Sequence, residues 1–118
     1  MKKPMAASDI SRFSIVTVPF PYVDQLAEKR RPALIISTAE LLRAHGLVWV
    51  AMITSAENRP WPDDISVAAH QACGLPSPSV IRPAKIAAIE ASRIVRVLGA
   101  LSKGDIELVM NYFRRSFQ

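Results

Sequence analysis

The sequence predicts a small, mainly β-barrel domain with one helix packed against it at the C-terminal end. Short segments rich in β-branched and aromatic residues recur at close spacing, bounded by proline, glycine or polar clusters. The last segment instead has apolar residues three and four positions apart, as in an amphipathic helix. A length of 118 residues suits one hydrophobic core. We therefore expect a single domain over residues 12–118, preceded by a flexible tail over 1–11.

The first two strands are predicted around a polar connection. Residues 14–18 are β-rich, and Pro19 is expected to end this strand because proline cannot donate to a central ladder. Residues 20–30 contain proline and charged side chains and are predicted to be irregular. Pro32 then leads into residues 33–36, a nearly all-apolar run that predicts a short strand buried on both faces.

A short helix and the strongest strand follow. Thr38 can cap a helix over 39–44, and Gly46 stands where a left-handed residue often ends one. Residues 47–54 are rich in Val, Ile and Trp, so we expect a strand with Trp49 in the core. This strand ends in the hydroxyl side chains Thr54 and Ser55, where a rigid ladder can hold polar groups next to solvent.

The residues from 58 onward predict several short strands and a final helix. We expect a loop over 58–64, strands over 65–68, 79–82, 85–89 and 94–101, and a turn over 91–93. Ser102 with Asp105 forms a capping-box variant that starts the helix. One face of that helix should pack on the barrel through Ile106, Val109, Met110, Phe113 and Phe117.

Charge and composition limit the possible partners and locations. Fifteen Lys and Arg against ten Asp and Glu give a net charge of +5, which favours an anionic partner. The longest apolar run, over 47–53, is far shorter than the roughly 20 residues that span a bilayer, and no secretory signal precedes it. The single cysteine, Cys73, permits no internal disulfide. These features predict a cytoplasmic protein without membrane contact.

Most familiar catalytic signatures are missing. The sequence has no glycine-rich phosphate loop and no nucleophile elbow, and neither His45 nor His70 has a carboxylate at metal-binding spacing. We expect no metal site and no cofactor. The cations at 29–31 differ from a solvated charge run, because they stand where a loop meets a buried strand. Such a cluster can hold a phosphate, to which the planar guanidinium is well matched.

Several motifs occur in the order typical of one family. They are Val18-Pro19-Phe20-Pro21, Lys29 to Ser37, Ile53-Thr54-Ser55, Gly74-Leu75-Pro76, Pro83-Ala84-Lys85-Ile86 and Leu98-Gly99-Ala100-Leu101. Over nearly its whole length the chain resembles the MazF/PemK toxins of bacterial toxin–antitoxin pairs. The resemblance implies an SH3-like β-barrel, shared with CcdB-type toxins, with a C-terminal helix. It also implies a homodimer, a cognate antitoxin and metal-independent cleavage of single-stranded RNA.

The resemblance carries over two catalytic positions. Arg31, just before the proline of the second strand, matches the family's catalytic arginine, and Thr54 matches its catalytic threonine. Both suit a reaction in which negative charge grows on phosphate oxygens and must be stabilised locally. Arg82 falls where some members have an active-site arginine, but Ala84 stands where those members have an aspartate. The general base is therefore not identified.

Other residues are expected to contact RNA rather than to react. Cations can follow the phosphates, and an exposed tryptophan can stack on an unpaired base. The residues expected to do so are Lys29, Arg30, Ser55, Arg59, Trp61, Arg82 and Lys85.

Two alternative functions remain open at this point. The chain also has Phe13-Ser14 where family members often have Gly-Asp. Because the aspartate is missing at Ala84, a barrel that binds RNA or a partner without cleaving is one alternative. A DNA gyrase inhibitor of the same fold is another, disfavoured because the chain lacks a terminal tryptophan and keeps Arg31 and Thr54.

Overall fold

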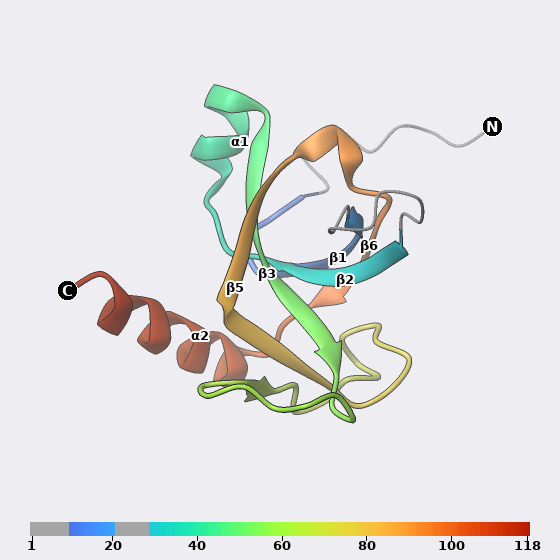
Figure 1. Ribbon diagram of the computed structural model, residues 1–118. Helices are drawn as coiled ribbons and strands as arrows, with labels where there is room; N and C mark the ends of the chain where they lie inside the picture. The colour runs from blue at the N-terminus through green and yellow to red at the C-terminus, as the bar shows by residue number, and fades with distance from the viewer. Residues whose placement is uncertain (1–9, 21–28) are drawn as a thin grey trace.

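Six antiparallel strands form one sheet that curves into a half-barrel, with a long helix at the C-terminal end (Figure 1). This computed structural model describes residues 10–20 and 29–118. The strand order across the sheet is β4-β5-β3-β2-β1-β6. The elements are β1 Ser14–Phe20, β2 Lys29–Ile35, α1 Ala39–His45, β3 Leu47–Ser55, β4 Ile65–Ser66, β5 Ser79–Glu90, a 3-10 turn Ala91–Arg93, β6 Arg96–Ala100 and α2 Lys103–Ser116.

The predicted fold class is confirmed in this arrangement of sheet and helix. The predicted tail over 1–11 lies outside the described residues except for its last two positions. Of these, Ile10 is buried and packs in the core, and Ser11 contacts the Ser14 hydroxyl. Within the described part of the chain, no helix is both long and apolar enough to cross a bilayer.

The centre of the sheet at β2 is buried on both faces, as the apolar run over 33–36 predicts. Leu34 belongs to one hydrophobic cluster together with Val109 of α2. Its neighbours Ala33 and Ile35 belong to a second cluster on the opposite face. Because successive strand residues point to opposite faces, each central strand supplies both clusters in alternation.

Two prolines lie inside strands, against the expectation that Pro19 ends the first one. β1 continues to Phe20, and Pro19 pairs with Arg30 of β2. The pairing of β1 with β6 ends at Thr17, so Pro19 has a strand neighbour on one side only and no ladder bond is lost. Pro32 likewise precedes the paired stretch of β2 and β3, which begins at Ala33. The predicted connection is thus shorter than expected, and its residues 21–28 lie outside the described ones.

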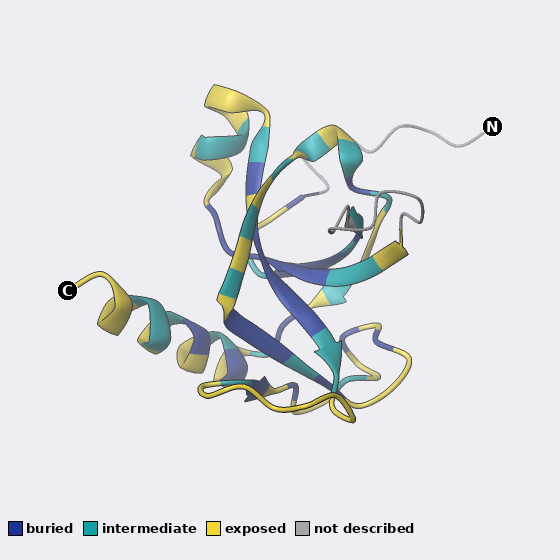
Figure 2. Cartoon of the chain, in the orientation of Figure 1, coloured by how far each residue is buried: buried dark blue, intermediate teal, exposed yellow. Residues whose placement is uncertain are grey.

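The two segments predicted over 79–82 and 85–89 are one strand with a sharp irregularity. β3 pairs with β5 in a register that shifts between Ala51 and Met52. Ala51 faces Ile86 and Met52 faces Arg82, so the three residues between Arg82 and Ile86 have no partner on β3. The half of β5 before the shift is largely buried, whereas the half after it alternates between exposed and intermediate residues (Figure 2). β5 therefore belongs to two parts of the sheet that curve differently.

The long helix begins as predicted, but its capping box is not reciprocal. The Ser102 hydroxyl accepts the N–H of Asp105. The Asp105 carboxylate, which is buried, accepts instead the N–H of Ala68 just after β4. Val109 is completely buried and Phe113 packs against the same cluster, whereas Phe117 is 77% exposed, so the expected apolar face packs on the sheet as far as Phe113. The shorter helix α1 begins at Thr38 without a side-chain cap and ends at Gly46 with φ of 67°.

The segment between β4 and β5 packs directly on the backbone of β6. Gly74 has φ of 83°, and a Cβ there would overlap the carbonyl group of Leu98. Gly99 has the same relation to the carbonyl group of Cys73. Cys73 is 2% exposed and packs in the core as a small apolar residue. Two glycines therefore permit an approach of two backbones that no larger residue allows.

Gly74→Ala is expected to destabilise the protein by about 3 kcal/mol, from left-handed backbone strain and overpacking together. Gly46→Ala is the matched control, because Gly46 also has a positive φ but has open space around its missing side chain. It should cost only about 1 kcal/mol. Urea denaturation of the three proteins measures both values. Equal losses in the two variants would contradict the close approach at Gly74.

Candidate active site

A basic hollow of about 900 Å³ opens where five strands contribute lining residues, near the start of β2 and the end of β3. Lys29, Arg30 and Arg31 come from β2, and Arg96 comes from β6. One wall is the segment between β4 and β5, where Gly74 packs closely on the backbone of β6. The hollow is lined by Thr17, Lys29, Arg30, Arg31, Pro32, Ile53, Thr54, Ser55, Asn58, Gln71, Gly74, Leu75, Pro76, Ser77, Ser79, Arg96 and Leu98.

Arg31 and Thr54 lie on neighbouring strands and line the same hollow. β2 and β3 pair antiparallel, with Ala33 opposite Met52 and Leu34 opposite Ala51. Continuing this register by two residues brings Arg31 opposite Thr54. Side chains at opposite positions of an antiparallel pair point to the same face of the sheet. The two residues singled out in the sequence, 23 positions apart, therefore face one space.

The Arg31 guanidinium has an unused donor in this space. Its Nε is buried and has no hydrogen-bond partner among the described residues. A buried donor without a partner costs about 1–3 kcal/mol, so it is normally satisfied unless a ligand is to use it. Lys29, Arg30 and Arg96 are exposed cations of the same hollow. The arrangement can bind an anion that places an oxygen next to Arg31.

The Thr54 hydroxyl receives a hydrogen bond from a residue that sequence reasoning missed. The side-chain nitrogen of Asn58 donates to Thr54 Oγ1. Asn58 follows a tight turn in which its own N–H donates to the Ser55 carbonyl, 3.1 Å away. A polar residue four positions after Thr54, just beyond the end of β3, is the signal that the sequence offered. Thr17, Gln71 and Arg96 were also missed, because their approach depends on strand pairings far apart in the chain.

Five of the nine predicted site residues line the hollow, and four do not. Arg59, Trp61, Arg82 and Lys85 belong instead to a neighbouring arrangement around the Trp61 ring. The Arg82 guanidinium lies 4.5 Å from the centre of that ring, and the Lys85 ammonium lies 5.8 Å from it. Trp61 itself is 41% exposed. Its ring thus combines a cationic surrounding with access to solvent.

Arg82 is held by an ion pair inside the protein. It is 9% exposed, and its Nε and Nη2 donate to the two carboxylate oxygens of Asp64, both at 3.0 Å. Nη2 also donates to the Arg59 carbonyl. Burial alone would raise the pKa of Asp64, but hydrogen bonds from Arg82 and from the Trp61 N–H, together with the Arg82 charge, lower it. This forked pair fixes the loop between β3 and β4.

Stability is expected to decrease in acid because of this carboxylate. A lowered pKa in the folded state stabilises the protein above the unfolded value of 3.8, and this stabilisation is lost as the pH falls through the folded value. Melting temperatures between pH 7 and pH 2.5 should therefore drop more steeply for the natural protein than for Asp64→Asn. Asp63→Asn is the control, since Asp63 is exposed and only 3.9 Å from Arg115. A natural profile that Asp64→Asn leaves unchanged would contradict this role.

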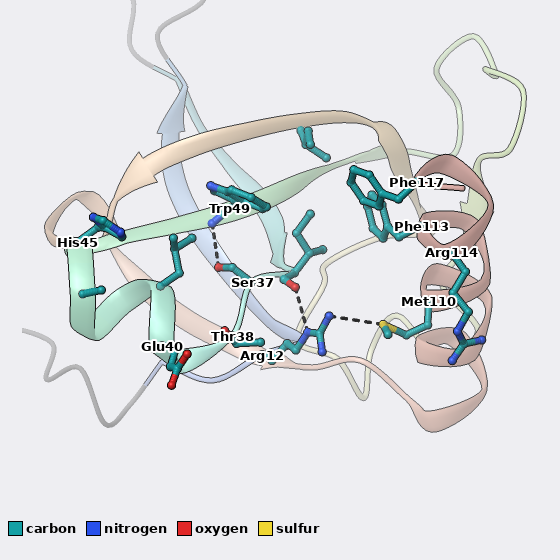
Figure 3. Close-up of a pocket in the computed structure, with 14 residues that line it drawn as sticks. Arg12, Ser37, Thr38, Glu40, His45, Trp49, Met110, Phe113, Arg114 and Phe117 are labelled. Atoms are coloured by element: carbon teal, nitrogen blue, oxygen red, sulfur yellow. Dashed lines mark hydrogen bonds between the residues drawn. The ribbon is translucent and has the colours of Figure 1, made fainter.

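A second cavity, of about 630 Å³, is mostly apolar and lies between α1, the outer face of β3 and β5, and α2 (Figure 3). Trp49, expected in the core, is 45% exposed and lines this apolar groove. Its side chain leaves the sheet on the side where α1 and the end of α2 stand apart, and no element covers it (Figure 3). Ile86 and Phe117 in the same groove are 46% and 77% exposed. Large apolar side chains gathered in this way mark an interaction surface.

Arg12 joins the two sides of the groove. Its Nε donates to the Ile36 carbonyl at 2.9 Å, and Nη2 lies 3.6 Å from the sulfur of Met110 on α2 (Figure 3). The guanidinium also lies over the Phe13 ring. It therefore helps to hold α2 at its angle to the sheet. Among the described residues, no three His, Cys, Asp or Glu side chains are grouped closely enough to hold a metal ion.

Comparisons with known proteins give one consistent result. The family model for the PemK-like, MazF-like toxin of type II toxin–antitoxin systems matches residues 11–117. Mycobacterium tuberculosis toxin MazF-mt6 is similar in structure, with a TM-score of 0.67 and 26% identity over 88% of this chain and 95% of that one. No curated protein is similar enough in sequence to count as a match.

Two further structures share the fold at lower identity. A MazE-MazF structure from Deinococcus radiodurans gives a TM-score of 0.72 at 20% identity, covering 92% of this chain and 95% of that one. An endoribonuclease in complex with its cognate antitoxin, from Mycobacterial species, gives 0.70 at 13% identity and covers 92% of both chains.

Proposed function

This chain belongs to the PemK-like, MazF-like family of toxins from type II toxin–antitoxin systems, and from that membership we propose that it cleaves single-stranded RNA in the basic hollow. Endoribonuclease activity is general to the family. The observation that carries the proposal for this chain is that Arg31, whose buried Nε has no hydrogen-bond partner among the described residues, lines the same hollow as Thr54.

The two side chains suit cleavage that uses the RNA's own 2′-hydroxyl. Its oxygen forms a bond to the adjacent phosphorus while the bond from phosphorus to the 5′-oxygen breaks. Negative charge grows on the non-bridging oxygens, where the Arg31 guanidinium and the Thr54 hydroxyl can donate. The products are a 2′,3′-cyclic phosphate and a free 5′-hydroxyl. DNA lacks the 2′-hydroxyl and should remain intact.

The reaction requires two proton transfers. The proton of the 2′-hydroxyl must leave to a base, and the 5′-oxygen must gain a proton as it departs. Arginine remains charged at any working pH, so Arg31 stabilises charge and can donate toward the leaving oxygen, but it is a poor base. None of the described residues that line the hollow is a carboxylate or a histidine. We therefore assign no base.

The cations around the hollow favour a role in binding the RNA backbone. Lys29, Arg30 and Ser55 line it, and we propose that they contact phosphates on either side of the cleaved one. Trp61 is the proposed stacking surface for an unpaired base, with Arg59 and Lys85 as further backbone contacts. The Arg82 guanidinium packs against the Trp61 ring and pairs with Asp64, and it does not line the hollow.

The proposed partners follow from the same family membership. Structurally similar proteins include a MazE-MazF structure and an endoribonuclease with its cognate antitoxin. We propose that a cognate antitoxin likewise restrains this chain in the cytoplasm, where the RNA is.

Cleavage in the presence of a chelator tests the proposed function. Purified protein is incubated with single-stranded RNA and the matching DNA in excess EDTA, beside Arg31→Ala and Thr54→Ala. We expect the RNA to be cut to 2′,3′-cyclic phosphate ends by the natural protein and the DNA to survive. Intact RNA would overturn the proposal and favour a barrel that binds without cleaving.

The apolar groove supports a homodimer. Trp49, Ile86 and Phe117 gather there as exposed apolar side chains, which a second copy of the chain can cover. Phe117→Glu is expected to convert the dimer to a monomer in light scattering at micromolar concentration. Leu108→Glu is the control, since Leu108 is 52% exposed on the same helix but does not line the groove. A natural protein that is monomeric at 100 µM, about 100-fold above a micromolar Kd, would contradict the homodimer.

A further inference from the structure

We infer that Asn58 is a positioning residue that holds the Thr54 hydroxyl with its proton free to reach the phosphate, an inference that rests on the proposed function. The side-chain nitrogen of Asn58 donates to Thr54 Oγ1. Both residues line the basic hollow together with Arg31, whose Nε has no partner in the part of the chain that the structure describes. Asn58 itself does not need to touch the RNA for this role.

The backbone brings Asn58 back over the end of β3. The N–H of Asn58 donates to the Ser55 carbonyl at 3.1 Å, which closes a turn of four residues. The N–H of Glu57 donates to the Ser55 hydroxyl at 3.2 Å, and the N–H of Ala56 donates to the Pro78 carbonyl at 3.0 Å. Three hydrogen bonds thus fix the turn from within and from the neighbouring segment. This fixed backbone places the exposed Asn58 side chain beside Thr54.

The direction of the hydrogen bond decides what Thr54 can do. A hydroxyl has one proton to donate and two lone pairs that accept. When Asn58 donates to Oγ1, one lone pair is occupied and the proton remains available for a phosphate oxygen. A bond received at the oxygen also polarises the hydroxyl and makes it a stronger donor. An acceptor in place of the Asn58 nitrogen would instead take the Thr54 proton for itself.

Asn58→Asp replaces the donating amide nitrogen with an accepting carboxylate oxygen and hardly changes the shape of the side chain. At neutral pH we expect it to lower the single-turnover rate of cleavage at saturating protein by about 100-fold, and Asn58→Ala by about 10-fold. The Asn58→Asp rate should recover as the pH falls toward about 4, where the carboxyl regains a proton to donate. The Asn58→Ala rate should show no such recovery.

A double-mutant cycle separates positioning from simple repulsion of the RNA. In a Thr54→Ala background, the Asn58 substitutions should cause no further loss of rate, because there is no hydroxyl left to position. RNA affinity, measured by fluorescence anisotropy in the same proteins, reports repulsion alone. Asn111→Asp controls for the added negative charge, since Asn111 lies on α2, lines neither cavity and accepts a hydrogen bond from Arg114. It should cleave at the natural rate.

A spectroscopic readout tests the contact without any cleavage. The side-chain amide signals of Asn58 in a nitrogen-proton NMR spectrum should shift in Thr54→Val and stay in place in Ser66→Ala, a change on β4. Unshifted signals in Thr54→Val would overturn the inference. So would natural rates in both Asn58 variants, or equal losses with and without the Thr54 hydroxyl. These results leave the proposed function intact if the natural protein cleaves RNA, whereas a natural protein that cleaves nothing overturns both.

Discussion

Arg31→Ala is expected to lower the rate of RNA cleavage by at least about 100-fold while leaving the fold intact. Removal of one preorganised donor from a site of developing charge typically costs a factor of about 10²–10³. The side chain is only partly buried, and its Nε makes no hydrogen bond that the fold would lose. Single-turnover cleavage measures the rate, and thermal denaturation checks that the melting temperature changes by only a few degrees.

Two further variants define what Arg31 contributes. Arg31→Lys keeps the charge but loses the planar fork of donors, so its rate should lie between those of the natural protein and Arg31→Ala. Arg43→Ala is the control for loss of a cation, because Arg43 is exposed on α1 and lines neither cavity. An Arg31→Ala rate within a factor of about 3 of the natural one would remove Arg31 from the reaction.

Asp64→Ala is expected to destabilise the protein by about 3–5 kcal/mol, the largest effect on folding among these changes. Removal of one partner from a buried ion pair leaves the other as an uncompensated charge. Here that charge is the Arg82 guanidinium, which is 9% exposed and uses both carboxylate oxygens of Asp64. Denaturation in urea at pH 7 measures the change in the free energy of unfolding.

The double variant Asp64→Ala/Arg82→Met shows whether the loss comes from the stranded charge. An apolar side chain of similar volume removes that charge, so the double variant should be more stable than Asp64→Ala alone. Asp63→Asn should cost less than about 1 kcal/mol, since its ion pair is exposed and long. A loss below about 1 kcal/mol in Asp64→Ala would show that solvent screens the pair.

The order of the elements could be predicted because it depends on local pattern. The period of two in the strands, the left-handed residue at Gly46 and the Ser102 cap are read from residues close together in the chain. That Arg31 and Thr54 lie at one site was expected only from the family resemblance. The register of β2 and β3 gives the physical reason, because it brings the two residues opposite each other.

The parts that could not be predicted depend on pairings between distant segments. Arg96 reaches the hollow because β6 pairs with β1, almost 80 residues earlier. Arg82 was expected to contact RNA, but it does not line the basic hollow. It lies at the register shift of β5, where the sheet face to which a side chain points depends on the unpaired residues that follow. Trp49 is exposed because a β propensity does not say which face of the sheet is covered.

The alternation of the strands between two hydrophobic clusters also determines how tolerant the catalytic centre can be. A slip of β2 by a single residue would send every one of its apolar side chains to the wrong side at once, so hydrocarbon packing alone penalises misalignment. The guanidinium and the alcohol acquire their mutual placement from this penalty and need no attraction for each other. Side chains that line the basic hollow can consequently be exchanged without the molecule losing its architecture.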